Sequence, residues 1–422
     1  MKRNDVTAQM PAQGKSEMEN DIRVGVAVVG RFHAFDLARE LQTHNLLGQL
    51  LSTYPARITA RWGIDSGKIL GEPLLELMRR FGSRQKLLNP QRLHEFVAVR
   101  HGLNARRLVA NSDVFIGWSG SSLEALIAAR AAGKVTILER GSSHCNEWRT
   151  LMREENSRFG QDFDEMPFFW QRELLEYELA DYISIPSNFV RESFVRHGVP
   201  EDKLLVNSYG VDLSAFRKLE KTDETFRVIN VGGFHRRKGS HYLLQAFAEL
   251  DLPDAEFWHV GSVSPEMQPI IEKLANDNCT FHGHQPQDQL YKFYSQASVF
   301  VLASIEEGMA MVQCQAMACG LPIICTTNTG GADLIGGEGH AGYVVPIRDV
   351  EALKARILHL YDNRDLAAEM GRRAQARVNN GLRWKDYGDR YAANIRRVVE
   401  MRGQAGAPAH SSEKTAIEVR GK

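Results

Sequence analysis

The sequence predicts an α/β protein with two domains, each built on a parallel β-sheet covered by helices. Three observations lead to this fold class. The chain has 422 residues, more than one hydrophobic core usually organises. Short runs rich in β-branched residues alternate with longer helical patterns, as they do in parallel sheets covered on both faces. A polar, glycine-containing segment separates two groups of these runs. We therefore expect two Rossmann-like domains that face each other across a cleft.

Eight apolar runs are predicted to form strands, because each is short and rich in Val, Ile, Leu or Phe. They cover residues 22–29, 113–117, 134–138, 181–185, 226–231, 256–260, 298–303 and 321–325. A further strand is expected to end near Val206. The segments between strands show helical periodicity; in residues 241–250, four apolar side chains share one face. Such a face predicts core packing rather than a binding site.

The domain boundary is predicted in residues 207–225, which carry a glycine, several charges and little apolar periodicity. We expect an N-terminal domain over residues 21–212 and a C-terminal domain over residues 213–402. Residues 1–20 and 403–422 lack apolar periodicity and predict disordered tails.

Composition and charge argue against several classes of protein. The chain has 52 basic and 52 acidic residues, so its net charge does not attract nucleic acid. Its five cysteines contain no C-x-x-C pair, which argues against a disulfide framework and a zinc site. No run reaches the roughly 18 apolar residues of a membrane span, and the N-terminus lacks the apolar core of a signal peptide. We therefore expect a protein of the reducing cytoplasm.

Residues 79–107 are strongly basic, with eight Lys and Arg and the single acid Glu95. A solvated helix face is one interpretation of this stretch. The other is a surface that meets anionic lipid headgroups or an anionic acceptor, which would make the protein peripheral on the inner membrane face. Both interpretations stay open.

Ligands of open α/β sheets bind beyond the carboxyl ends of the strands, so the loops there are the candidate sites. The loop after strand 226–231 reads GGFHRRKG and leads into a helix. Its glycines allow backbone amides to approach a ligand, the helix N-terminus favours negative charge, and three cations follow. These residues are Gly232, Gly233, Arg236, Arg237 and Lys238. Their chemistry favours a phosphate site over a simple tight turn.

The loop after strand 298–303 carries Glu306, Glu307 and Gly308 ahead of a second helix. A carboxylate at a helix start can simply complement the helix dipole. It can also accept hydrogen bonds from a sugar while the helix amides face a phosphate. Gln315, roughly two turns beyond Glu307, can hydrogen-bond a ribose. Residues 327–345 form a third glycine-rich segment, which by itself we interpret as a surface connection.

Together these segments resemble family 4 of the retaining glycosyltransferases, the group 1 type with the GT-B fold. The resemblance extends over residues 22–402, and its marks follow the family's order: ELADYISIPSNFVRESFVRHGVPEDKLLVNSYGVD, VGGFHRRKG, EEGMAMVQCQAMACGLPII and GGADLIGGEGHAGYVVP. It implies a hexosyltransferase that moves a sugar from a UDP- or GDP-linked donor to a glycan, polysaccharide or lipid-linked acceptor, with retention of configuration. It also implies that the N-terminal domain binds the acceptor, that the C-terminal domain binds the nucleotide-sugar, and that the last helix can pack back on the N-terminal domain. No metal or cofactor is implied, because the nucleotide-sugar is a substrate.

The resemblance assigns roles by position. Lys238 matches the lysine that holds the donor diphosphate, and Glu307 matches the first acid of the E-x7-E motif beside the donor sugar. Gln315 falls on the second acid, at the ribose. The backbone that faces the donor is Gly308, Met309, Ala310 and Met311.

Two departures stand out from this pattern. The family usually has an arginine where this chain has Gly233, so a diphosphate loses one cation unless Arg236 or Arg237 replaces it. Gln315 keeps its hydrogen bonding but lacks the charge of the second acid. These departures are the reason to keep a second interpretation open, a catalytically inert nucleotide-sugar-binding regulatory subunit; a nucleotide-sugar epimerase on the same fold is a third.

On the N-terminal side, Gly30 and His33 belong to a glycine loop after the first strand, similar to that of the family, and are expected to line the cleft. The segment ERGSSHCNEW follows strand 134–138, where many relatives place a histidine beside the reacting centre. His144 is the expected catalytic histidine, and Arg140 competes for the same place. A lone histidine is more often structural, which is the alternative for both histidines.

Overall fold

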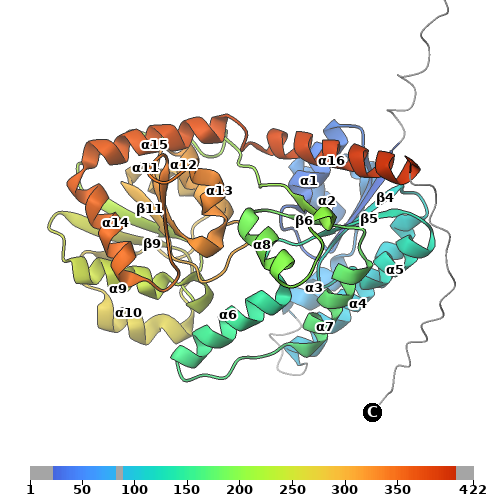
Figure 1. Cartoon of the computed structure of the whole chain (residues 1–422), viewed down its shortest axis with the longest axis horizontal. Helices are drawn as coiled ribbons and strands as arrows, with labels where there is room; N and C mark the ends of the chain where they lie inside the picture. Colours follow the sequence, from blue (N-terminus) through green and yellow to red (C-terminus); the bar gives the residue numbers. More distant parts are fainter. Residues whose placement is uncertain (1–21, 82–88, 405–422) are drawn as a thin grey trace, which may run out of the picture.

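The computed structural model describes residues 22–81 and 89–404 and shows two lobes, each a sheet covered by helices (Figure 1). The predicted N-terminal tail, residues 405–422 of the predicted C-terminal tail and residues 82–88 of the basic stretch lie outside the described residues. The last helix continues to Gln404 and so includes the first two residues of the predicted C-terminal tail, which corrects that boundary.

The first lobe, the N-terminal domain, contains a seven-stranded parallel sheet in the order β3-β2-β1-β4-β5-β6-β7. The strands are β1 (Val24–Val28), β2 (Leu47–Ser52), β3 (Ile69–Gly71), β4 (Val114–Trp118), β5 (Val135–Glu139), β6 (Tyr182–Ile185) and β7 (Leu204–Val206). Because the strand order reverses between β1 and β4, the loops after the central strands define the ligand-binding edge.

In the part of this domain that the structure describes, eight α-helices and three short 3-10 helices lie between these strands. The α-helices are α1 (Ala34–Thr43), α2 (Ala56–Thr59), α3 (Pro73–Phe81), α4 (Pro90–Val109), α5 (Leu123–Ala131), α6 (Cys145–Arg158), α7 (Pro167–Leu179) and α8 (Asn188–Arg196). The 3-10 helices are η1 (Ala60–Trp62), η2 (Ser66–Lys68) and η3 (Glu201–Lys203).

The second lobe, the C-terminal domain, contains a six-stranded parallel sheet in the order β10-β9-β8-β11-β12-β13. The strands are β8 (Phe226–Val231), β9 (Ala255–Val260), β10 (Cys279–Phe281), β11 (Val299–Leu302), β12 (Ile323–Thr326) and β13 (Gly342–Val345). The helices of this lobe are η4 (Arg236–Lys238), α9 (Ser240–Leu250), η5 (Pro265–Met267), α10 (Gln268–Leu274), η6 (Gln287–Gln289), α11 (Leu290–Gln296), α12 (Met311–Ala318), η7 (Thr327–Thr329), α13 (Gly331–Ile335), α14 (Val350–Asp362) and α15 (Arg364–Asn379). The helix α16 (Trp384–Gln404) follows α15 and lies on the first lobe.

All eight predicted strands are present, with ends displaced by at most two residues. The strands β2, β3, β10 and β13 are not among the runs predicted. β3 and β10 have three residues each and lie at the edges of their sheets, where partial exposure leaves no continuous apolar run.

The chain crosses between the lobes twice, at residues 207–225 and between α15 and α16. These crossings lie together, because Val211 pairs with Arg383 in an isolated bridge. After the second crossing α16 lies against α1 and β5 of the N-terminal domain (Figure 1). The side chain of Asn207 donates to the carbonyl of Tyr387 in α16 over 3.3 Å.

Two further features bear on the class of protein. No helix of the described residues combines the length and apolar character needed to cross a membrane. All five cysteines are free, and only Cys279 is not buried.

Candidate active site

The loop after β8 places Lys238 at the carboxyl end of its sheet. Gly232 has φ 135°, and Gly239 has φ 57° and lies so close to the carbonyl oxygen of Ala303 that a Cβ would overlap it. Between these two glycines the chain forms η4, and α9 begins directly after it at Ser240. The turn therefore holds Lys238 at the start of a helix.

The loop after β11 brings a carboxylate to that lysine. Lys238 Nζ lies 2.7 Å from Glu307 Oε1, and Arg237 Nη2 lies 3.9 Å from the same oxygen. The backbone N–H of Glu307 donates to the carbonyl of Asn328 over 2.8 Å, which fixes the loop. The cation and the carboxylate come from neighbouring parallel strands and meet at one sheet edge.

The segment after Glu307 leads into α12, which begins at Met311. Met309 and Ala310 are buried, and Ala310 caps the helix without a side-chain hydrogen bond. Gln315 lies inside this helix and is 6% exposed, and its Oε1 accepts a 3.4 Å hydrogen bond from Tyr294. The side-chain amide of Gln315 is thus hydrogen-bonded to a buried tyrosine.

Arg236 is already paired, which corrects its expected role at the diphosphate. Its Nη2 lies 2.8 Å from Glu266, its Nη1 donates to Asn156 over 3.0 Å, and the guanidinium stands 4.8 Å from the ring centre of Phe159. Asn156 belongs to α6 of the other lobe. Arg236 therefore joins the two domains instead of offering a free cation.

Arg237 also takes part in an interdomain contact, through the buried carboxylate of Glu306. Arg237 Nε donates to Glu306 Oε2 over 2.9 Å, and Glu306 Oε1 accepts from Ser142 Oγ and Ser143 N over 2.8 Å each. Burial by itself raises the pKa of Glu306, but Arg237 and the two serines bring that pKa below its usual value. The loops after β5 and β11 are thereby connected.

Glycines allow this junction to close. A Cβ on Gly308 would overlap the carbonyl oxygen of Gly141, and the carbonyl of Gly308 accepts from Ser187 Oγ over 2.6 Å. A Cβ on Gly330 would lie 2.8 Å from that same carbonyl oxygen. Gly330 belongs to the third glycine-rich segment. That segment is therefore packed against the site, and its interpretation as a plain surface connection is wrong.

His33 forms a hydrogen bond with Glu139, the last residue of β5. His33 Nε2 is 2.8 Å from Glu139 Oε2, and Tyr391 of α16 donates to Glu139 Oε1 over 2.6 Å. His33 is only 5% exposed, and its ring centre lies 4.3 Å from that of Tyr209. Gly30 differs, because it has φ 84° and a Cβ there would meet no atom within 4 Å.

His144 serves as the cap of α6, which corrects its expected catalytic role. Its Nδ1 accepts from Asn146 N over 3.2 Å, and its ring stacks on His197 at 4.6 Å. Burial, with help from the nearby His197 and Arg140, lowers the pKa of His144 to about 3. The imidazole is neutral and enclosed.

Arg140 is likewise used by the protein itself. It pairs with Glu173 and donates from Nη2 to the carbonyl of Ser143 over 3.0 Å. These contacts hold the loop after β5 in shape, so Arg140 positions that loop and is not a free ligand for substrate.

Phe32 and His235 are two features of this region that the motifs did not single out. Phe32 is 64% exposed and has φ 42°, a backbone conformation that is uncommon for a bulky residue. The pattern carried a usable signal for His235, since it stands inside the phosphate-type loop. Phe32 likewise stands between Gly30 and His33 in the glycine loop after β1.

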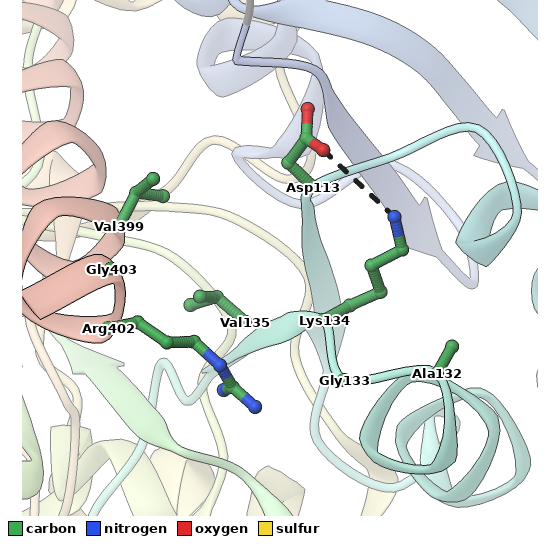
Figure 2. Close-up of a pocket in the computed structure, with 8 residues that line it drawn as sticks. All are labelled: Asp113, Ala132, Gly133, Lys134, Val135, Val399, Arg402 and Gly403. Carbon is green, nitrogen blue, oxygen red and sulfur yellow. Dashed lines mark ion pairs between the residues drawn. The ribbon is translucent and has the colours of Figure 1, made fainter. Parts of the chain in front are cut away.

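A surface hollow of about 390 Å³ lies elsewhere in the N-terminal domain (Figure 2). Asp113, Lys134 and Arg402 are its charged residues, and Lys134 Nζ is 4.0 Å from Asp113 Oδ1. Asp113 and Lys134 precede β4 and β5 directly. The hollow therefore adjoins the amino ends of these strands, the edge opposite to the one where ligands of such sheets bind.

Residues 212–377 match the family described as glycosyl transferases, group 1. This match lies almost entirely within the C-terminal domain and covers less than half of the chain. A putative colanic acid biosynthesis glycosyltransferase of Salmonella typhimurium is 28% identical over 173 residues, which are 38% of this chain and 42% of the relative. The chain thus spans less than half of that relative. A mannosyltransferase of Corynebacterium glutamicum, GDP-mannose-dependent and acting on a monoacylated phosphatidylinositol monomannoside, is 25% identical over 65% of this chain and 74% of its own.

Solved structures establish the fold. A sucrose-phosphate synthase from Thermosynechococcus elongatus aligns with a TM-score of 0.71 and 18% identity over 90% of this chain and all of its own. Anabaena HepE in complex with UDP-glucose aligns with a TM-score of 0.66 and 14% identity over 89% of this chain and all of its own. The fold is therefore GT-B, with two Rossmann-like domains.

Proposed function

We propose that the protein transfers a hexosyl group from a UDP- or GDP-linked donor to a glycan, polysaccharide or lipid-linked acceptor, with retention of configuration. The observation that carries this proposal is the 2.7 Å approach of Lys238 Nζ to Glu307 Oε1 where the loops after β8 and β11 meet. A cation suited to a diphosphate and a carboxylate suited to sugar hydroxyls lie side by side there. The match of residues 212–377 to group 1 glycosyltransferases supports the same reading.

The proposed chemistry follows from these charges. As the bond between the anomeric carbon and the phosphate oxygen breaks, negative charge grows on the leaving diphosphate. Lys238 and the N–H groups at the start of α12 stabilise that charge, while Glu307 accepts hydrogen bonds from the sugar. The acceptor hydroxyl oxygen then bonds to the anomeric carbon on the face that the diphosphate leaves, and its proton passes to the departing phosphate oxygen. The fixed cations of the chain do the work that a metal ion does elsewhere.

The acceptor is proposed to bind on the N-terminal side. The loop after β1 presents open space at Gly30 and the exposed ring of Phe32 next to it. An aromatic face of this kind offers a large apolar surface against which a sugar ring can lie.

A membrane surface is the proposed place at which a lipid-linked acceptor is met. Leu74 and Leu77 of α3 are 68% and 54% exposed, and Phe96 and Leu103 of α4 are 51% and 39% exposed. Each pair recurs at helical spacing and shares a helix face, and both helices belong to the basic stretch or border it. Exposed apolar side chains beside arginines favour an anionic lipid surface over a purely solvated face.

The arginines of this surface are not all available, since Arg79 and Arg80 pair with Glu76 and Arg107 lies 3.5 Å from Glu72. Salt-sensitive pelleting with vesicles that contain anionic lipid is expected, and Leu77→Ser with Phe96→Ser is expected to reduce it. If the protein does not pellet with anionic vesicles, residues 79–107 form a solvated helix face instead of a membrane-binding surface. The five free cysteines support a reducing, cytoplasmic location for the reaction.

Incubation with a panel of UDP- and GDP-sugars tests the main proposal. We expect one donor to raise the melting temperature and to be hydrolysed slowly to free nucleotide. The competing candidate is an inert regulatory subunit, which Gly233 and Gln315 favour because both lack charges that the resembling family usually has. Such a subunit binds a nucleotide-sugar but never hydrolyses it to free nucleotide.

A further inference from the structure

Gly233 stands where the resembling family usually has an arginine, and its own backbone does not require glycine. Its neighbour Gly232 has φ 135° and Gly239 at the end of the loop has φ 57°, whereas Gly233 is not in the left-handed region. A side chain at residue 233 is therefore compatible with the backbone. The backbone conformation therefore does not explain why residue 233 has no side chain.

The ring of His235 fills the space beside Gly233. A Cβ on Gly233 would lie 2.8 Å from Cδ2 and 3.2 Å from Nε2 of His235. The first distance is shorter than real Cβ contacts, so a larger residue at position 233 would displace the imidazole. His235 is only partly buried. The two residues thus form a matched pair in which the imidazole takes the place of the missing side chain.

Charged groups from three elements face this imidazole. Lys238 and Arg237 come from its own loop, Glu307 from the loop after β11, and Glu266 from η5. Burial lowers the pKa of His235, and Lys238 and Arg237 lower it further, against the opposing effect of Glu307 and Glu266. The ring is neutral at pH 7 while no anion is bound.

We propose that His235 replaces the missing arginine as a diphosphate ligand: when a nucleoside diphosphate binds at Lys238, the imidazole takes up a proton from solvent and donates a hydrogen bond to a phosphate oxygen. This inference rests on the proposed function, because it needs a diphosphate at Lys238. A bound diphosphate adds negative charge next to the ring and so favours its protonated form. Binding is then coupled to proton uptake, and affinity falls as pH rises from the lowered pKa of the free ring to the higher pKa of the ring in the complex.

Calorimetric titration with UDP and with GDP at pH 7 tests the proposal. Repeating each titration in two buffers of different ionisation enthalpy gives the number of protons taken up. His235→Asn keeps a polar side chain but cannot become charged. We expect this variant to bind the preferred nucleotide about tenfold more weakly, which corresponds to one pKa unit of differential interaction. On binding, this variant should also take up fewer protons than the wild type, and the difference should be a sizeable fraction of one proton per site. Protons exchanged by the nucleotide itself are the same for both proteins and cancel in this difference.

A double variant that exchanges the two side chains distinguishes loss of a phosphate ligand from a general loss of structure. In Gly233→Arg with His235→Ala the imidazole is gone, so the arginine side chain has room. We expect this double variant to recover the affinity of the wild type to within about threefold while lacking its proton uptake. His340→Asn, an equal change at an exposed histidine of the same domain, serves as the control and should match the wild type.

The outcomes separate the two proposals. A wild type that binds nucleotide, together with His235→Asn of equal affinity and equal proton uptake, overturns the role of His235 and leaves the proposed function standing. A wild type that binds neither UDP nor GDP overturns the proposed function, and the role of His235 falls with it.

Discussion

Arg348 of the C-terminal domain donates from Nε to Oε2 of Glu155 in α6 over 2.8 Å and so ties the two domains together. Glu155 is fully buried and also lies 3.1 Å from the hydroxyl of Tyr242 and 3.2 Å from Nε2 of His241. Burial by itself raises the pKa of Glu155, but His241 and Arg348 hold that pKa below its usual value. With Glu306 bound to Ser142 and Ser143, each domain contributes one buried carboxylate to the other.

Glu155→Gln is expected to lower the free energy of unfolding by about 3 kcal/mol, because it leaves Arg348 without its buried partner. A larger radius of gyration in solution scattering should accompany the loss. Glu154→Gln is the matched control, since Glu154 is 54% exposed and pairs with the same arginine at 3.1 Å. A surface pair of that kind contributes under about 1 kcal/mol. Equal effects of the two variants would contradict an interdomain role for Glu155.

Acid is expected to weaken the protein in two pH ranges. His144 has a pKa of about 3 in the folded chain and a higher one when unfolded, so the unfolded chain binds the extra proton. Stability is then complete above about pH 6.5 and falls as pH drops below it. The carboxylates of Glu155 and Glu306 have lowered pKa values, and their contribution is lost only as pH falls below about 4.5.

His144→Asn keeps a capping side chain and cannot become charged. Between pH 6.5 and 4.5 its free energy of unfolding should depend less steeply on pH than that of the wild type, by up to one proton. Its turnover should stay near that of the wild type. A large loss of turnover with unchanged stability would restore His144 to the reaction centre.

Lys238→Ala is expected to reduce turnover by about two orders of magnitude, the usual effect of removing one transition-state stabiliser. Lys292→Ala, at an exposed position of α11, is the control and should leave turnover unchanged. Near-normal turnover in Lys238→Ala would remove this lysine from the active site.

Glu307→Gln is expected to impair sugar transfer while leaving nucleotide affinity largely intact. The reason is that the carboxylate is proposed to bind sugar hydroxyls, whereas Lys238 binds the diphosphate. Transfer assays and nucleotide titration on the same preparation measure both quantities. Weaker nucleotide binding with normal transfer would show that the role of Glu307 is misassigned.

Phe32→Ala is expected to slow transfer to the acceptor without slowing donor hydrolysis, since the ring is proposed to contact only the acceptor. Phe32→Gly should do the same and also raise the free energy of unfolding by about 1 kcal/mol, because φ 42° is strained for Phe and unstrained for Gly. Hydrolysis that slows together with transfer would place Phe32 at the donor instead.

Much of the sheet framework follows from the sequence alone. Strands of a parallel sheet are buried on both faces, so β8 and β12 read as apolar runs without help from distant contacts. The edge strand β10 is partly exposed and three residues long, and no local pattern distinguishes it from a loop. Lys238 and Glu307 were singled out by pattern, and the structure brings them together because the loops after two neighbouring parallel strands end at one sheet edge.

The remaining site residues depend on contacts between segments far apart in the chain. The sequence presents Arg236, Arg140 and His144 as free polar groups beside a site, yet each has a hydrogen-bond or ion-pair partner in α6, α7 or α8. Charge and hydrogen-bonding capacity are properties of the residue, and the sequence determined them, together with the alternation of strands and helices. Only tertiary packing decided which of those charged groups can contact a ligand and which form ion pairs or hydrogen bonds inside the protein. The reason is that buried polar groups need partners, and no local pattern in the sequence encodes those partners.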